Sequence, residues 1–197
     1  MPEYDRSDAA SQDCEFAARA VKVSAARVAA VADAHAITGP AMINNDVLRS
    51  IRYMLDLSDG KVVEITKLAD ADFVIDKTQA HAFLKKDEEE GYVECDDAVL
   101  AHFLDGLVFL RRGRDESLPP RPVEKRISNN LVLKKLRVAF ELKDADMHQI
   151  FVDAGFPVSK PELSALFRLP GHKNFRRCGD QMLRNFLKGL TMRVRGA

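Results

Sequence analysis

One segment occurs twice in this chain of 197 residues. Residues 44–52, NNDVLRSIR, return at 129–137 as NNLVLKKLR, and residues 95–107 return with a closely similar pattern at 178–190. Such a duplication predicts two copies of one supersecondary unit. A residue that holds the unit together is expected in both copies, whereas a residue with a task in only one copy can differ. Comparing the copies therefore separates residues of the fold from candidate functional residues.

Each copy is predicted to form four short helices, because its apolar residues recur at helical intervals. The first helix starts at an asparagine pair, Asn44-Asn45 or Asn129-Asn130, which stands where a helix N-cap is expected. The predicted fold class is therefore all-α, with two tandem four-helix repeats packed with pseudo-two-fold symmetry. The apolar faces of the two first helices comprise Val47, Leu48, Ile51, Met54 and Leu55 in copy 1, and Val132, Leu133, Leu136, Ala139 and Phe140 in copy 2.

Local signals mark the boundaries of the second and third helices. The second helix is predicted to end near Asp72 in copy 1 and at Gly155, a residue typical of helix C-termini, in copy 2. The third helix opens with a short polar residue followed three positions later by Gln or Glu, at Asp76–Gln79 and Ser159–Glu162. This spacing predicts a capping box in both copies.

The fourth helix of each copy is predicted to pack tightly. Gly106 and Gly189 lie within its apolar face, where glycine costs up to about 1 kcal/mol relative to alanine. Their presence in both copies predicts close approach to a neighbouring helix. Cys95 and Cys178 precede this helix and are interpreted as small buried hydrophobic residues.

Composition divides the chain into four parts. Residues 1–42 include an alanine-rich stretch that buries little apolar surface, which predicts a weakly ordered arm upstream of a start at Met42. Repeat 1, residues 43–110, has 7 basic and 15 acidic residues, whereas repeat 2, residues 129–197, has 13 basic and 6 acidic residues. Residues 111–128 contain Pro119-Pro120-Arg121-Pro122 and are predicted to form an extended linker. One repeat is acidic and the other is basic.

Composition and motifs argue against several functional classes. No run approaches the roughly 20 apolar residues of a membrane span, the acidic start does not resemble a secretory signal, and three cysteines make no disulfide framework. We therefore expect a cytoplasmic protein. The sequence contains no metal-ligand set, nucleophile motif or phosphate-binding glycine loop. We accordingly expect a protein without enzymatic activity, metal or cofactor.

The copies differ most in the loop before the fourth helix. Residues 85–94 of copy 1 read KKDEEEGYVE, and the corresponding residues 168–177 read RLPGHKNFRR, so the charge of the loop changes sign. Cations beside an aromatic ring suit a phosphate backbone with a stacked base. We therefore predict that repeat 2 binds nucleic acid, as RNA or a ribonucleoprotein, through Arg168, His172, Lys173, Arg176, Arg177 and Lys188.

Two other interpretations fit the same charge pattern. In the first, the acidic loop of repeat 1 docks on the basic loop of repeat 2 within the chain. In the second, the protein is an interaction adaptor whose acidic and basic ends bind protein partners or another copy of the chain.

Three segments together resemble a known family. Residues 44–59, NNDVLRSIRYMLDLSD, residues 156–168, FPVSKPELSALFR, and residues 171–175, GHKNF, are similar to the YehS-like bacterial proteins. The resemblance extends over residues 42–196, and these proteins consist of a tandem domain of unknown function. It implies a small cytoplasmic bacterial protein of two repeats and supplies no catalytic residues. The chain departs from the pattern in its N-terminal preface and at Asp70-Ala71-Asp72, where a glycine-type helix end is expected.

Overall fold

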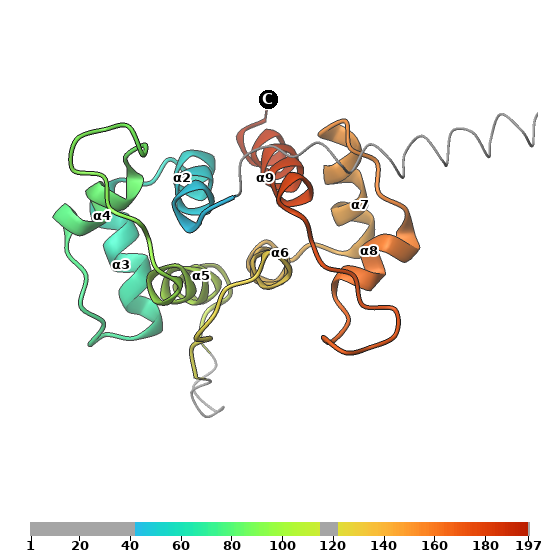
Figure 1. Ribbon diagram of the computed structural model, residues 1–197, viewed down its shortest axis with the longest axis horizontal. Helices are drawn as coiled ribbons and strands as arrows, with labels where there is room; N and C mark the ends of the chain where they lie inside the picture. The colour runs from blue at the N-terminus through green and yellow to red at the C-terminus, as the bar shows by residue number, and fades with distance from the viewer. Residues whose placement is uncertain (1–41, 115–121, 197) are drawn as a thin grey trace, which may run out of the picture. The chain divides into compact units, whose positions relative to one another are not determined.

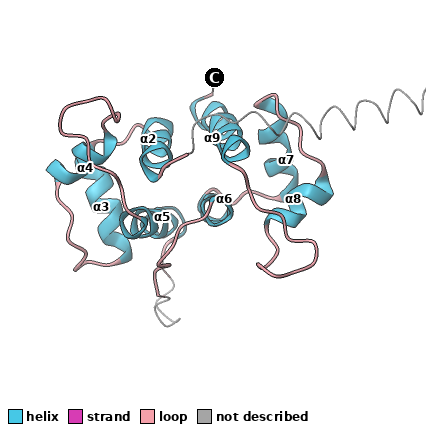
Figure 2. Ribbon diagram, in the orientation of Figure 1, coloured by secondary structure: helices cyan, strands magenta, loops and turns pink. Residues whose placement is uncertain are grey.

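The computed structural model describes residues 42–114 and 122–196, which lie in one compact unit. These residues form eight helices and no strand (Figure 2). Repeat 1 contains α2 (Asn44–Leu55), α3 (Asp59–Ala69), α4 (Lys77–Leu84) and α5 (Asp97–Arg112), and repeat 2 contains α6 (Asn129–Ala139), α7 (Asp144–Asp153), α8 (Lys160–Leu166) and α9 (Asp180–Arg195). The predicted all-α fold of two repeats is confirmed. The predicted arm, except for Met42, lies outside the described residues.

Four helices form the centre of this unit. Helix α5 packs against α6, and α2 packs against α9 (Figure 1). Because α6 is the counterpart of α2, and α9 is that of α5, these two contacts are pseudo-equivalent. Helices α3 and α4 lie on the outer side of repeat 1, and α7 and α8 lie on the outer side of repeat 2 (Figure 1). The two copies thus meet through the first and last helices of each repeat.

The predicted apolar faces form the core. Val47, Leu48, Ile51 and Met54 of α2 are buried, as are Val132, Leu133, Leu136 and Ala139 of α6. The last residue of each predicted face, Leu55 or Phe140, is partly buried against the same core. Burial of apolar surface is the main favourable term in folding. The apolar spacing therefore identified the correct face of both helices.

Gly106 and Gly189 allow two helix pairs to approach closely. A Cβ atom at Gly106 of α5 would lie 1.7 Å from the backbone oxygen of Ile65 in α3. In repeat 2, a Cβ atom at Gly189 of α9 would lie 2.1 Å from the backbone oxygen of Ile150 in α7. Both distances are far below van der Waals contact. The predicted packing role of these glycines is confirmed.

Three predicted helix boundaries are wrong. The N-caps of α2 and α6 are Ile43 and Ser128, one position before each asparagine pair. The asparagine side chains instead bond to distant backbone, as described below. Helix α3 ends at Ala69 rather than near Asp72, because the Asp70 carboxylate accepts a hydrogen bond from the Asp72 N–H and starts a turn.

The predicted third-helix starts and the glycine at the end of the second helix of repeat 2 are confirmed. Capping boxes form at Asp76 with Gln79 and at Ser159 with Glu162. Gly155 follows the end of α7 with a φ of +76°, in the left-handed region that favours glycine. The predicted start of the linker at residue 111 is wrong, because helix α5 continues to Arg112. Residues 115–121 of the predicted linker lie outside the described residues.

Candidate functional site

The loop between α4 and α5 is fastened to α2 by one buried side chain. The Asn45 amide donates hydrogen bonds to the backbone oxygens of Phe83 (2.9 Å) and Val93 (2.8 Å). Its carbonyl oxygen accepts a bond from the Cys95 N–H at 2.8 Å. Asn45 is fully buried, so these bonds satisfy polar groups that water does not reach. Both ends of the loop are therefore held to the first helix.

Repeat 2 uses the same arrangement for its basic loop. The Asn130 amide donates to the backbone oxygens of Leu166 (2.8 Å) and Arg176 (2.9 Å), and its carbonyl oxygen accepts from the Cys178 N–H (2.9 Å). The preceding asparagine of each pair bonds to the start of the fourth helix, as in the 2.7 Å contact of Asn129 with Asp180. Two loops of opposite charge are thus held by equivalent sets of asparagine hydrogen bonds, which we call the asparagine frame of each repeat.

The structure brings five of the six predicted binding residues together in the loop between α8 and α9. Lys173 and Arg177 are exposed and form no ion pair with another described residue. Arg168 lies beside the ring of His172, with 3.4 Å between the guanidinium and Nδ1. Arg176 is less available, because it forms an ion pair with Glu162.

The acidic partner in that ion pair, Glu162, lies in the first turn of α8. Although burial opposes ionisation, hydrogen bonds from Ser159 and then from Arg176 hold the pKa of Glu162 below its ordinary value. Glu162 is also the last residue of the capping box. Arg176 therefore has a structural role that its position in a basic run did not reveal.

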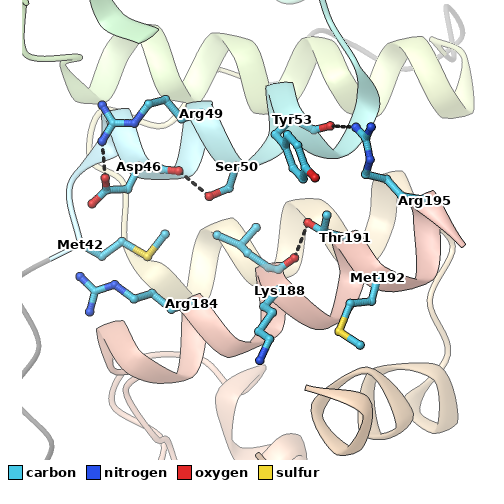
Figure 3. Close-up of a pocket in the computed structure, with 11 residues that line it drawn as sticks. Met42, Asp46, Arg49, Ser50, Tyr53, Arg184, Lys188, Thr191, Met192 and Arg195 are labelled. Carbon is cyan, nitrogen blue, oxygen red and sulfur yellow. Dashed lines mark hydrogen bonds and ion pairs between the residues drawn. The ribbon is translucent and has the colours of Figure 1, made fainter. Parts of the chain in front are cut away.

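Lys188, the sixth predicted residue, lies elsewhere. It is exposed on α9, and it lines an open groove of about 690 Å³ between α2 and α9 (Figure 3). None of the five loop residues lines this groove. The six residues therefore form two surfaces rather than one.

The groove has an apolar part contributed by both repeats. Tyr53 of α2 and Met42, which precedes α2, line it on one side, and Leu187 and Met192 of α9 line it on the other. Tyr53 is 63% exposed, so most of its side chain is open to a ligand. Figure 3 shows Tyr53 and Arg195 side by side at one end of the groove. The guanidinium carbon of Arg195 lies 4.4 Å from the centre of the Tyr53 ring, within cation–π distance.

Charged residues in the groove are mainly basic. Arg49, Arg184, Lys188 and Arg195 line it together with one acid, Asp46. Asp46 is already paired with Arg49 at 2.5 Å. The groove therefore carries a net positive charge that its own carboxylate does not balance.

The pseudo-equivalent contact between α5 and α6 has different chemistry. There Asp105 of α5 forms an ion pair with Lys135 of α6, and the two side chains are only 16% and 24% exposed. Lys188 is the counterpart of Asp105, and Ser50 is the counterpart of Lys135. A basic residue thus replaces the acid, and a short hydroxyl replaces the base. The described residues give Lys188 no ion pair.

Sequence comparison missed most of this groove. It selected Lys188 for its charge, but not Tyr53, whose counterpart is Val138, or Met192, whose counterpart is Phe109. The signal lay in the paired change from Asp105 and Lys135 to Lys188 and Ser50. The sequence alone does not show that these residues belong to one surface, because that depends on the contact between α2 and α9.

The two loops of opposite charge do not dock on each other in this unit. Among the described residues no ion pair joins residues 85–94 to residues 168–177. Figure 1 shows the loops on opposite sides of the four central helices. The intramolecular docking interpretation is therefore not supported by the arrangement of the helices.

The described residues contain no group of three metal-ligating side chains and no helix that could cross a membrane. Cys95 and Cys178 are buried, and burial raises the pKa of each thiol to about 12. A thiol is nucleophilic only as the thiolate. These two cysteines therefore have the properties of core residues.

Comparison with known proteins agrees with the two-repeat architecture. Residues 44–113 and 129–196 each match the family described as "Protein of unknown function (DUF1456)". The chain is also 48% identical over 152 residues to "Uncharacterized protein YehS" of Escherichia coli strain K12, covering 77% of this chain and 96% of that protein. No solved structure matches the chain. Both halves match the same family, and the two matched segments together cover most of the chain. The chain therefore belongs to the DUF1456 family.

Proposed function

We propose that the protein is a non-catalytic nucleic-acid-binding protein that binds single-stranded RNA through its basic second repeat. The supporting observation is that two neighbouring exposed cations of repeat 2 have no acidic partner among the described residues. Lys173 and Arg177 lie together in the α8–α9 loop without an ion pair to another described residue. Arginine and lysine side chains that neutralise phosphates supply most of the affinity in such interfaces.

The frame beneath the loop supports this proposal. Asn130 holds both ends of the loop to α6, so Lys173 and Arg177 project from a fastened segment. Less ordering entropy is then lost when the loop binds. Repeat 1 has a similar frame but carries Asp87, Glu88, Glu89 and Glu90, all exposed, in its loop. RNA is therefore expected to contact repeat 2 and to avoid the acidic loop.

Fluorescence anisotropy with a labelled RNA of about 12 nucleotides tests the proposal, because single-strand sites span roughly 4–16 nucleotides. Binding should weaken linearly on a logarithmic salt scale, with a slope of about −0.7 for each phosphate contacted. Replacing both Lys173 and Arg177 by Glu should weaken binding about tenfold or more. The matched control is Lys67→Glu with Lys77→Glu in repeat 1. Absence of binding at low salt, or equal losses in both double variants, would refute the proposal.

A second candidate function is self-association through the loops of opposite charge. It is favoured by their placement on opposite sides of the central helices (Figure 1), which prevents pairing within one unit but permits head-to-tail pairing between copies. Sedimentation velocity at low and high salt tests it. Salt-sensitive oligomers that disappear in the Lys173→Glu, Arg177→Glu variant are expected. A monomer at low salt and high concentration would exclude this function.

A further inference from the structure

An exposed aromatic side chain, that of Tyr53, lies in the groove between α2 and α9. Arg195 lies over the Tyr53 ring at 4.4 Å and also donates a hydrogen bond to the backbone oxygen of Tyr53. Tyr53 is nevertheless 63% exposed. A base could therefore stack on Tyr53 at little cost in side-chain entropy, because Arg195 already restricts the ring. Stacking on aromatic side chains is the usual sequence-tolerant contact with single-stranded nucleic acids.

Lys188 supplies the charge that a phosphate needs. It lies seven residues before Arg195 on α9, about 10 Å along the helix at 1.5 Å per residue. Its pseudo-equivalent, Asp105, is neutralised by Lys135, but the position that corresponds to Lys135 holds Ser50, and Lys188 forms no ion pair among the described residues. Figure 3 shows the Lys188 side chain directed away from Ser50 and α2. A bound anion would balance this charge.

Two hydroxyl groups in the groove are positioned to accept hydrogen bonds. Ser50 donates its proton to the Asp46 backbone oxygen, and Thr191 donates to the Leu187 backbone oxygen, both at 2.7 Å. Because each hydroxyl proton is engaged, each oxygen offers lone pairs to a ligand. A ribose 2′-hydroxyl or an exocyclic base amine can donate to them.

We propose that the α2–α9 groove is a nucleotide subsite in which a base stacks on Tyr53 and an adjacent phosphate binds Lys188. This inference rests on the proposed binding of RNA and assigns part of that binding to a surface separate from the α8–α9 loop. The groove volume, about 690 Å³, is within the range of roughly 300–1,000 Å³ that small-ligand sites occupy. An acidic protein segment would satisfy Lys188 but has no need of a stacking ring, so the arrangement favours a nucleotide.

The test compares a labelled RNA of about 12 nucleotides with an abasic strand that has the same phosphates. Stacking of one base is expected to make the wild-type protein bind the normal RNA at least about fivefold more tightly than the abasic strand. Tyr53→Ala should remove this preference, whereas Tyr53→Phe should retain it. Lys188→Asp, which gives α9 the residue of its counterpart in α5, should weaken both strands equally and reduce the salt slope by about 0.7.

Lys67→Asp, on the outer helix α3, is the matched charge-reversal control, and circular dichroism checks that each variant is folded. If wild-type protein binds RNA but Tyr53→Ala keeps the preference for bases, or Lys188→Asp behaves like Lys67→Asp, the groove inference fails while the proposed function stands. If wild-type protein binds neither strand, both fail. If polyglutamate displaces the RNA at equal charge concentration, an acidic protein segment is the ligand and the inference is overturned.

Discussion

Replacing Gly106 by alanine should destabilise the protein although alanine is the better helix former. The new Cβ would lie 1.7 Å from the Ile65 backbone oxygen, and real Cβ atoms essentially never approach closer than 3.0 Å. Helices α3 and α5 must therefore move apart by about 1.3 Å along this direction. The contacting atom belongs to the backbone of a helix, so no side-chain rotation relieves the clash.

The expected magnitude follows from the packing around this contact. Val62, Ile65, Phe103 and Leu107 of α3 and α5 are fully buried. A gap of 0.5–1 Å removes about a quarter to a half of the dispersion energy of each affected contact. Overpacking and lost contacts should together cost about 3–5 kcal/mol. Helix propensity returns about 1 kcal/mol, so the free energy of unfolding should fall by about 2–4 kcal/mol.

Urea unfolding followed by far-UV circular dichroism measures this change. Gly60→Ala is a matched control, because Gly60 is also helical but its Cβ would meet only the flexible end of Lys77, at 2.8 Å. That variant should be as stable as the wild type or slightly more stable. A Gly106→Ala protein that unfolds at the wild-type urea concentration, or above it, would refute the packing argument.

Two further perturbations test the frame and the buried thiols. Asn130→Ala leaves the Cys178 N–H and two backbone oxygens without their hydrogen-bond partner, so the free energy of unfolding should fall by about 2–4 kcal/mol. A loss near 1 kcal/mol, as for an ordinary helix cap, would contradict the proposed role of Asn130 in holding the loop. The pKa of Cys95 and Cys178 rises from 9.0 to about 12 on folding, so the unfolded state loses these protons first as pH rises. The free energy of unfolding should accordingly decline above pH 9, by about 1.4 kcal/mol per pH unit for each thiol. In a Cys14→Ser variant, both remaining thiols should react with a thiol reagent only when the protein unfolds. A Cys95→Ala, Cys178→Ala protein with the same alkaline decline would show that other groups cause it.

Local and periodic signals predicted much of the fold. The burial of Leu48 and Leu133 follows from helical spacing, and the capping boxes at Asp76 and Ser159 follow from residues three positions apart. The role of Gly106 was predictable because glycine is unfavourable within a helix unless packing requires it. Duplication strengthened each of these predictions, since the same signal occurred twice.

The features that were missed depend on residues far apart in the chain. Asn45 was interpreted as a helix cap, but its partners Phe83 and Val93 lie 38 and 48 residues away. Similarly, Tyr53 and Lys188 share a groove only because α2 contacts α9. Composition gave the charge of repeat 2 but could not show that Arg176 forms an ion pair, whereas Lys173 has none with any residue that the structure describes. Pairing depends on three-dimensional proximity, which a charge count does not contain.

The two pseudo-equivalent contacts, α2 with α9 and α5 with α6, give the protein the geometry of a symmetric homodimer whose subunits have been joined into one polypeptide. In a homodimer every substitution appears on both sides of the axis. In a fused chain one side can change alone. The ion pair of Asp105 with Lys135 can thus be kept in the α5–α6 contact, while Lys188 and Ser50 line a groove at the α2–α9 contact. Fusion also makes the association of the halves independent of protein concentration, so one contact can diverge while the other continues to hold the halves together.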